Sequence, residues 1–190
     1  MRVIAGKYRS RPLRSLRGMD VRPTTDRLRE TLFNVLTAGN SEALSGAVWL
    51  DLFAGTGAVG IEALSRGARQ VYFVDSSPGA TATIRANLKS LGIEEGFEVM
   101  DREALPGLRR LDAQAVTFDY CFLDPPYRRE DAYEETLGFL SQTNGMKRST
   151  VVIAEHDKRF DPGERFGGLE RYRMLKQGDA ALSFYRINGG

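Results

Sequence analysis

The alternation of short apolar segments with segments of helical spacing constrains the fold of this chain more than any other feature. Residues 48–53 are apolar and are followed by a glycine-rich turn and a helical pattern that Gly67 closes. The next apolar segment, residues 70–74, precedes Ser77 and Pro78, which suit the N-cap and the first position of a helix. Strands that alternate with helices in this way predict a parallel sheet with helices on both faces.

The same alternation continues to the C-terminus. Ile84, Leu88 and Leu91 share one helical face, and Gly92 is expected to end that helix. Further strands are expected at residues 97–100, 118–123 and 150–154, further helices at residues 24–38 and 133–140, and an antiparallel hairpin at residues 172–177 and 181–187. The sequence therefore predicts an α/β fold with a mostly parallel seven-stranded sheet, a C-terminal antiparallel hairpin and an N-terminal extension.

Composition limits the kinds of site that the chain can build. Cys121 and His156 are the only cysteine and histidine among 190 residues. They allow no internal disulfide and no Cys-rich zinc site, and they argue against a histidine-based metal site, so we expect no metal. We expect Cys121 to be packed in its strand and His156 to be a surface or strand-end residue. The chain has no apolar run of the ~20 residues that span a bilayer and no signal-peptide core, so we expect a cytoplasmic protein without a membrane partner.

The charge of the chain is divided unevenly along its length. The formal net charge is only +2, but residues 1–29 hold nine Arg and Lys against two Asp, which gives +7 there and leaves −5 for the remainder. A basic arm on a mildly acidic body suggests a polyanion as the partner, and a solvated, flexible tail is the alternative. The candidate residues for binding such a polyanion are Lys7, Arg9, Arg11, Arg14 and Arg22 in this arm, with Arg128 and Arg129 further along the chain.

Three glycines after the first strand predict a ligand-binding turn. Gly55, Gly57 and Gly60 let the backbone turn sharply and approach a ligand beside the start of a helix. They also satisfy the G-x-G-x-x-G pattern of NAD-type folds, in which Asp75 would hold a ribose hydroxyl. Asp51 favours a different ligand, because a carboxylate before the glycines repels a pyrophosphate and suits a cationic amino acid. The run from Asp51 to Gly57 resembles the D-x-F-x-G-x-G motif of S-adenosylmethionine-dependent methyltransferases, and a tight turn without a ligand is the alternative.

That resemblance implies a role for each residue of a cofactor site. Asp51 would act on the methionine amino group, the glycines would line the amino-acid portion, and Asp75 would accept hydrogen bonds from the ribose hydroxyls. Asp101, after the third strand, would contact the adenine amino group, and its alternative is the N-cap of the next helix. The cofactor-binding residues expected on this basis are Asp51, Phe53, Ala54, Gly55, Thr56, Gly57, Asp75, Ser76, Asp101 and Arg102.

A second motif, Asp124-Pro125-Pro126-Tyr127, follows the fourth strand. Prolines lack N–H donors and stiffen the backbone, so the Asp124 carboxylate and the Pro125 carbonyl form a rigid pair of acceptors for the two N–H groups of an exocyclic amine. Tyr127 offers a ring on which a base can stack. The tetrapeptide resembles the [DNS]-P-P-[YFW] motif of methyltransferases that act on amino groups, so Asp124, Pro125, Pro126 and Tyr127 are the expected catalytic residues. A plain turn at the end of a strand is the alternative.

Residues 22–34 sharpen the resemblance. They are very similar to the R-P-T-x-D-x-x-R-E-x-L-F-N signature of the bacterial 16S ribosomal RNA guanine-N2 methyltransferases. Membership would imply a Rossmann-like class I methyltransferase fold, S-adenosylmethionine as cofactor, S-adenosylhomocysteine as product, and 16S rRNA or the assembled small ribosomal subunit as partner. In that family Arg22, Thr24 and Thr25 would lie over the cofactor pocket. Helix capping by Thr24 or Thr25 is the alternative, and both roles can hold together.

The resemblance also suggests a division of the chain. Residues 1–22 would form the basic N-terminal arm and residues 23–190 the methyltransferase domain, acting as a monomer. Two other hypotheses stay open: an N-methyltransferase of another amine, such as adenine N6 in RNA or DNA or a protein glutamine, and a non-catalytic RNA- or nucleotide-binding module. The basic arm argues against glutamine, the lack of a separate target-recognition domain argues against sequence-specific DNA methylation, and the intact motif at Asp124 argues against a non-catalytic module.

Overall fold

The computed structural model describes residues 1–16, 25–126 and 129–188. Helix α1 (Asp26–Leu36) comes first, and strands then alternate with helices as expected. The elements that follow are β1 (Val48–Leu52), α2 (Ala58–Ser65), β2 (Gln70–Asp75), α3 (Pro78–Leu91), β3 (Phe97–Asp101), α4 (Ala104–Ala113), β4 (Phe118–Leu123), α5 (Asp131–Leu140), β5 (Met146–Asp157), β6 (Arg165–Phe166), β7 (Leu169–Gln177) and β8 (Ala180–Ile187).

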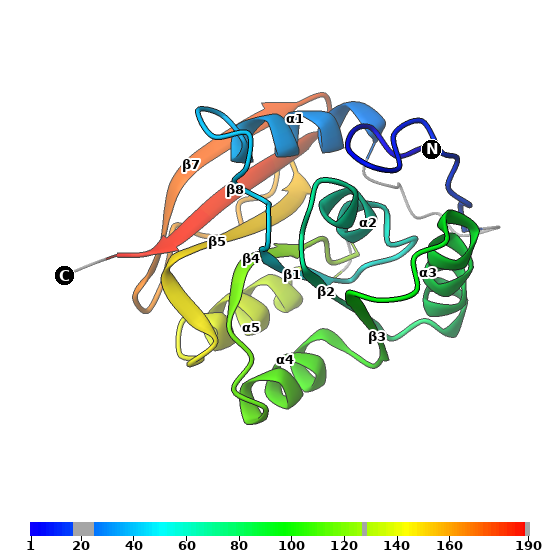
Figure 1. Ribbon diagram of the computed structural model, residues 1–190. Coiled ribbons are helices and arrows are strands. Elements are labelled where there is room, and N and C mark those ends of the chain that lie inside the picture. Colours follow the sequence, from blue (N-terminus) through cyan, green and yellow to red (C-terminus); the bar gives the residue numbers. More distant parts are fainter. Residues whose placement is uncertain (17–24, 127–128, 189–190) are drawn as a thin grey trace.

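These strands form one mixed sheet in the order β3-β2-β1-β4-β5-β8-β7-β6. Strands β1 to β5 are parallel, whereas β8, β7 and β6 are antiparallel. Helices α1, α2 and α3 cover one face, and α4 and α5 cover the other (Figure 1). The Rossmann-like arrangement and the C-terminal hairpin are confirmed. The described part of the chain has eight strands rather than seven, because the two-residue strand β6 pairs with β7 and is too short to leave a periodic signal.

Strand β1 lies where the strand order reverses. It pairs with β2 on one side and with β4 on the other. In sheets of this kind, ligands bind in the crevice outside the carboxyl ends of the strands that flank such a reversal. The segments that follow β1, β2 and β4 therefore lie at the position where a ligand site is expected.

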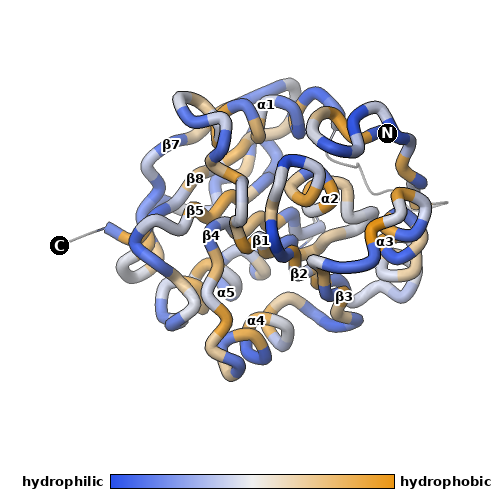
Figure 2. The backbone as a smooth tube through the Cα atoms, viewed as in Figure 1, coloured by the Kyte–Doolittle hydropathy of each residue, from blue (hydrophilic) through white to orange (hydrophobic). Residues whose placement is uncertain are grey.

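Apolar side chains fill the space between the sheet and its helices, and the hydrophobic colour in Figure 2 gathers along the strands. On the α1 side, the fully buried Trp49 ring stacks against Phe33 of α1 and Tyr120 of β4, with centroids 5.3 Å apart in each pair. On the other side, Leu108 of α4 and Leu137 of α5 are buried against the sheet. Burying a side chain of this size contributes ~1.5–3 kcal/mol, so these contacts stabilise the packing of both helix layers on the sheet.

Capping residues set several helix ends. Ser77 Oγ accepts a hydrogen bond from Ala80 N at the start of α3, and Gly92 closes that helix in the left-handed conformation, as expected. Thr25 Oγ1 accepts a hydrogen bond from Leu28 N at 3.2 Å, so the capping role proposed for Thr25 is confirmed.

Some elements differ from the sequence prediction. Helix α4 has no counterpart among the predicted helices, and β5 covers twelve residues rather than residues 150–154. His156 lies at the end of its strand, as one of the two expectations had it, but it is not on the surface: it is the penultimate residue of β5 and is only 1% exposed. Its Nε2 is 2.9 Å from Ser183 Oγ on β8, and burial lowers its pKa. Cys121 is buried as expected, and burial raises the pKa of its thiol.

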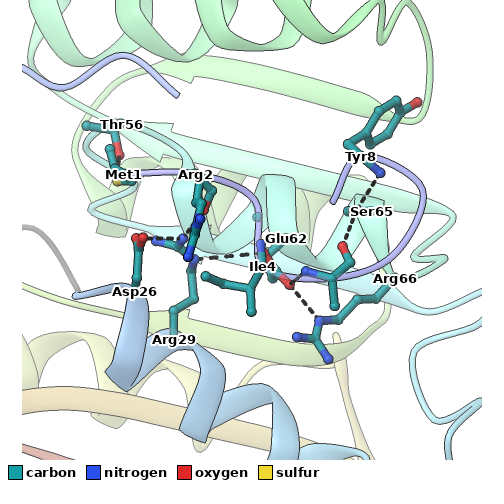
Figure 3. A network of polar contacts seen from close by, with 12 residues as sticks. Met1, Arg2, Ile4, Tyr8, Asp26, Arg29, Thr56, Glu62, Ser65 and Arg66 are labelled. Carbon is teal, nitrogen blue, oxygen red and sulfur yellow. Dashed lines mark hydrogen bonds and ion pairs between the residues drawn. The ribbon is translucent and has the colours of Figure 1, made fainter. Parts of the chain in front are cut away.

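The first sixteen residues of the basic arm are packed against the body of the protein. The Glu62 carboxylate of α2 accepts hydrogen bonds from Ile4 N at 2.7 Å and from Ala5 N at 3.0 Å (Figure 3). Val3 and Leu13 are 1% and 7% exposed and belong to the same core as α1, α2 and α3. A flexible, solvated tail therefore does not describe these residues. The boundary of the arm at residue 22 stays a prediction.

Candidate active site

The turn after β1 uses left-handed backbone conformations. The φ angle is 59° at Phe53, 55° at Gly55 and 75° at Gly57, which is the N-cap of α2. Gly60 meets a different requirement, because a Cβ there would lie 2.3 Å from the Phe73 ring of β2. Two glycines thus shape the turn and the third lets α2 pack closely on the sheet. A left-handed φ at Phe53 is strained for a bulky residue, and such strain concentrates at functional sites.

Asp75 holds this turn in place. Its carboxylate accepts a hydrogen bond from Gly55 N at 2.8 Å and another from Ser77 N at 2.8 Å. The two bonds join the glycine turn, the end of β2 and the start of α3. Asp75 therefore lies at the carboxyl edge of the sheet, as expected from the sequence, and it remains partly exposed there.

A hollow opens beside Asp75 and separates it from the Asp124 motif. Its cavity volume is about 90 Å³, below the ~300–1,000 Å³ typical of small-molecule sites, and its mouth is open to solvent. Its walls come from the ends of β1 and β2, the first turn of α4, the segment after β4 and helix α5. The lining residues include Phe53, Asp75, Ser76, Ala104, Leu105 and Pro126. Three residues expected to bind the cofactor and one of the catalytic motif thus share one hollow.

Asp51 is buried behind the glycine turn. Its side chain accepts a hydrogen bond from Gly60 N at 2.9 Å, and the residue is 1% exposed. Burial raises the pKa of its carboxyl to about 8, the Gly60 hydrogen bond opposes this change, and the charge of Asp75 adds to it. A cation beside this buried carboxyl would favour its ionised form.

The third-strand residues lie away from this hollow. The Asp101 carboxylate pairs with Arg85 of α3 at 3.2 Å and is exposed, and hydrogen bonds from Thr81 and Arg85 lower its pKa. Neither Asp101 nor Arg102 is among the residues that line the hollow, whereas Glu103 is. Glu103 is also the N-cap residue of α4, so Asp101 does not take that position. The predicted adenine contact of Asp101 stays a prediction, and its position gives that role no support.

Asp124 follows β4 and lies beside a second acid that the sequence did not single out, Glu155 of β5. Leu123 pairs with Ala154 in the parallel register, so Asp124 and Glu155 are the next residues on adjacent strands. Burial raises the pKa of the Asp124 carboxyl well above its usual range, and the charges of Glu155 and Asp51 raise it further. Glu155 is 5% exposed. An acid directly after the apolar segment at residues 150–154, at the same edge as Asp124, was the signal that could have identified it.

The candidate RNA-binding side chains lie on the surface where the structure describes them. Lys7, Arg9, Arg11, Arg14 and Arg129 are all exposed. Arg11 Nη2 donates a hydrogen bond to Ser90 O at 3.1 Å, and Arg129 pairs with Asp131. Four predicted site residues, Arg22, Thr24, Tyr127 and Arg128, lie outside the described residues.

Residues of the arm also contact the glycine turn. The buried Asn87 of α3 accepts a hydrogen bond from Arg14 N at 2.7 Å and donates one to Thr56 O at 3.0 Å. Thr56 Oγ1 lies 3.7 Å from the sulfur of Met1, which Figure 3 shows beside it. Thr56 lies between the two left-handed glycines. The arm therefore contacts the glycine turn near its start, through Met1, and near residue 14, through Asn87.

Two further observations bear on the type of site. Within residues 1–16, 25–126 and 129–188, no three His, Cys, Asp or Glu side chains are grouped so that they could hold a metal ion. The helices of these same ranges are all too short or too polar to cross a bilayer.

Comparison with known proteins relates nearly the whole chain to one family. The family model described as conserved hypothetical protein 95 matches residues 1–186. The chain is 34% identical over 190 residues to ribosomal RNA small subunit methyltransferase D of Haemophilus influenzae, covering 98% of this chain and 92% of that protein. The protein of the same name from Escherichia coli is 32% identical over 157 residues, covering 83% and 75% of the two chains.

Solved structures agree with the sequence comparison. The yhhF protein from Escherichia coli superposes with a TM-score of 0.82 at 29% identity, covering 98% of this chain and 97% of that chain. The SMU.776 protein, solved in complex with SAH, gives a TM-score of 0.63 at 13% identity over 85% of this chain and 48% of that chain. At that identity the likeness shows a shared fold alone.

Proposed function

This chain belongs to the family of the bacterial ribosomal RNA small subunit methyltransferases D, and we propose that it transfers a methyl group from S-adenosylmethionine to the exocyclic N2 amine of a guanine in 16S rRNA. The family supports methylation of ribosomal RNA. The choice of guanine N2 rests on the resemblance of residues 22–34 and on the Asp124 motif. The partner would be 16S rRNA, free or in the assembled small subunit, and the enzyme a cytoplasmic monomer.

One observation carries this proposal: a single hollow is lined by three of the expected cofactor residues and by one residue of the expected amine-binding motif. Phe53, Asp75 and Ser76 line it from β1 and β2, and Pro126 lines it from the segment after β4. Asp75 would accept hydrogen bonds from ribose hydroxyls at the carboxyl edge of the sheet, and the buried Asp51 would favour a cationic amino acid nearby. The residues of this site therefore fit S-adenosylmethionine.

The Asp124 motif would hold the amine that accepts the methyl group. When bound, S-adenosylmethionine supplies an electrophilic methyl group on its sulfonium. The Asp124 carboxylate and the Pro125 carbonyl would accept hydrogen bonds from the two N–H groups of the amine. These hydrogen bonds would orient the lone pair of the nitrogen and raise the electron density on that atom. Because burial and neighbouring charges raise the pKa of Asp124, its carboxylate is also suited to take the proton that the amine loses.

The basic arm would supply affinity for the RNA backbone. A catalytic site that grips one flipped-out or unpaired base needs phosphate contacts elsewhere to hold the RNA. Lys7, Arg9 and Arg11 are exposed on the folded arm and carry the charge for such contacts. Lys7 and Arg11 contact Ser65 and Ser90 at the C-terminal ends of α2 and α3, so these phosphate contacts would lie away from the cofactor turn, which begins α2.

The test is transfer of labelled methyl groups to RNA or small subunits from a strain that lacks this gene, followed by identification of the modified nucleoside. We expect N2-methylguanosine. The Asp124→Ala variant should lose transfer while its affinity for S-adenosylmethionine stays within a few-fold. Asp119→Ala, at the other end of β4, removes the same side chain and should retain transfer. A fully active Asp124→Ala variant would contradict the assigned role.

The alternatives give different products in the same assay. N6-methyladenosine would point to an adenine-N6 enzyme, and binding of RNA without any transfer would point to a non-catalytic module. Calorimetry with S-adenosylmethionine and with NAD separates the two cofactor classes, because only one of them should bind. Binding of NAD alone would contradict the proposal.

A further inference from the structure

Glu155 is fixed beside the predicted amine site by the backbone of the sheet. The parallel register of Leu123 with Ala154 brings Asp124 and Glu155 to the same edge of the sheet. Asp51, Phe122 and Ile153 are in register on one face, and Glu155, two residues after Ile153, projects on that same face. The charges of Glu155 and Asp51 both act on Asp124. The position of Glu155 is held from two directions, because its backbone carbonyl accepts a 2.7 Å hydrogen bond from Tyr133 of α5 and Leu182 of β8 pairs with it.

Glu155 and Asp124 form a pair of neighbouring acids at this edge of the sheet. Glu155 is only 5% exposed, and its charge opposes ionisation of the neighbouring Asp124. Two adjacent buried carboxyls disfavour each other's ionisation. The two carboxyls have four acceptor oxygens between them and at most a few O–H donors.

The hydrogen-bonding edge of guanine matches such a pair. Next to its N2 amine, guanine carries a second donor, N1–H, whereas adenine has an acceptor at N1 beside its N6 amine. We propose that Glu155 is a specificity-determining residue that accepts the N1–H hydrogen bond of guanine while Asp124 and Pro125 hold the N2 amine. This inference rests on the proposed function and extends it from the reaction to the choice of base. If N1 of the base were an acceptor, it would face an oxygen of Glu155, and neither of these two acceptors would have a donor.

The discriminating substrate is 2-aminopurine, which has the same exocyclic amine as guanine but no hydrogen on N1. We would place guanine or 2-aminopurine at the methylation position of the RNA, reconstituted into small subunits if the free RNA is inert, and measure kcat/KM for each. The Glu155→Gln variant keeps the size of the side chain and adds an amide donor that can serve an unprotonated N1. Glu155→Asp withdraws the carboxylate by one methylene without adding a donor. Asp157→Asn, two residues along β5, is the control.

We expect the unmodified protein to prefer guanine strongly, because sites built around a hydrogen bond reject the analogue that lacks it by up to ~10⁴–10⁵. Glu155→Gln should lower the ratio of kcat/KM for guanine to kcat/KM for 2-aminopurine at least about tenfold. Part of this decrease should come from faster methylation of 2-aminopurine. Glu155→Asp should slow guanine methylation and leave 2-aminopurine rejected, and Asp157→Asn should change neither. An unchanged preference in Glu155→Gln, with guanine still methylated, would overturn this inference alone. Absence of guanine methylation by the unmodified protein would instead overturn the proposed function.

Discussion

Asp51 is expected to make cofactor binding depend on pH. Burial raises the pKa of its carboxyl to about 8, so the carboxyl is largely protonated at neutral pH in the free protein. Only the ionised form gives a full charge partner to the ammonium group of the bound amino acid. Binding should therefore release a proton, and the affinity should rise as the pH approaches that pKa.

The magnitude follows from the ionised fraction. With a pKa of about 8, that fraction is about 1% at pH 6, about 9% at pH 7 and about 50% at pH 8. The affinity should then rise roughly ninefold from pH 6 to pH 7 and roughly fivefold from pH 7 to pH 8. In the Asp51→Asn variant, the amide oxygen can still accept the Gly60 N–H, but nothing titrates at this position, so the curve should be flat.

The assay is calorimetry with S-adenosylhomocysteine, which carries the amino group and cannot turn over, in buffers of different ionisation enthalpy. Proton release should appear with the unmodified protein and with Asp119→Asn as the control, and it should be absent from Asp51→Asn. The same slope in Asp51→Asn would refute the reasoning, because another group would then be titrating.

A second consequence concerns stability without ligand. Between the usual pKa of 3.8 and the raised value of about 8, the folded chain holds a proton on Asp51 that the unfolded chain has lost. The free energy of unfolding of the unmodified protein should therefore fall with rising pH in this window, relative to Asp51→Asn, by up to ~1.4 kcal/mol per pH unit. Urea unfolding of both proteins from pH 5 to pH 8 measures this difference. A constant difference would mean that the pKa of Asp51 is not raised.

Three further changes test other parts of the site. Asp75→Ala removes the acceptor of two backbone N–H groups and the predicted partner of the ribose. Each charge-assisted hydrogen bond is worth ~1.5–3 kcal/mol, so S-adenosylmethionine should bind at least about tenfold more weakly in calorimetry. Unchanged affinity would exclude the ribose contact. Replacing Arg9 and Arg11 by Ser should reduce the slope of log affinity for RNA against log salt by ~0.7–0.9 for each phosphate that the arm no longer neutralises. Cofactor binding should not change, and an unaltered slope would mean that these arginines bind no phosphate. Asn87→Leu leaves Thr56 O and an arm N–H without their partner and should cost ~1–3 kcal/mol in urea unfolding; a decrease below ~0.5 kcal/mol would contradict the role given to this side chain.

The structure also decides how the basic arm can be tested. Removing residues 1–17 would take away its arginines, but it would also remove Val3 and Leu13 from the core and leave the Glu62 carboxylate without Ile4 and Ala5 as donors. A truncated protein could then fail for lack of stability rather than for lack of RNA binding. Substitution of exposed arginines leaves the fold intact and isolates the charge.

The sequence by itself determined the features that local physics controls. Short apolar runs and helical spacings revealed most strands and helices, and the residues with special backbone geometry marked the turn at Gly55 and Gly57 and the end of α3 at Gly92. The acids that follow strands, such as Asp75 and Asp124, could be assigned to one edge because parallel strands end together. These predictions needed no knowledge of which strands are neighbours.

Strand pairing and long-range packing decided the rest. Glu155 becomes part of the site only because β5 pairs with β4 in a register that sets it beside Asp124. Glu62 binds backbone groups more than fifty residues earlier in the chain, and His156 is buried because β8 returns antiparallel and supplies Ser183. Such contacts join residues far apart in the sequence, and they depend on how the chain crosses the sheet and on the register of each strand. No local pattern encodes either, so the partner of a buried acid or histidine emerges only when the whole sheet is assembled.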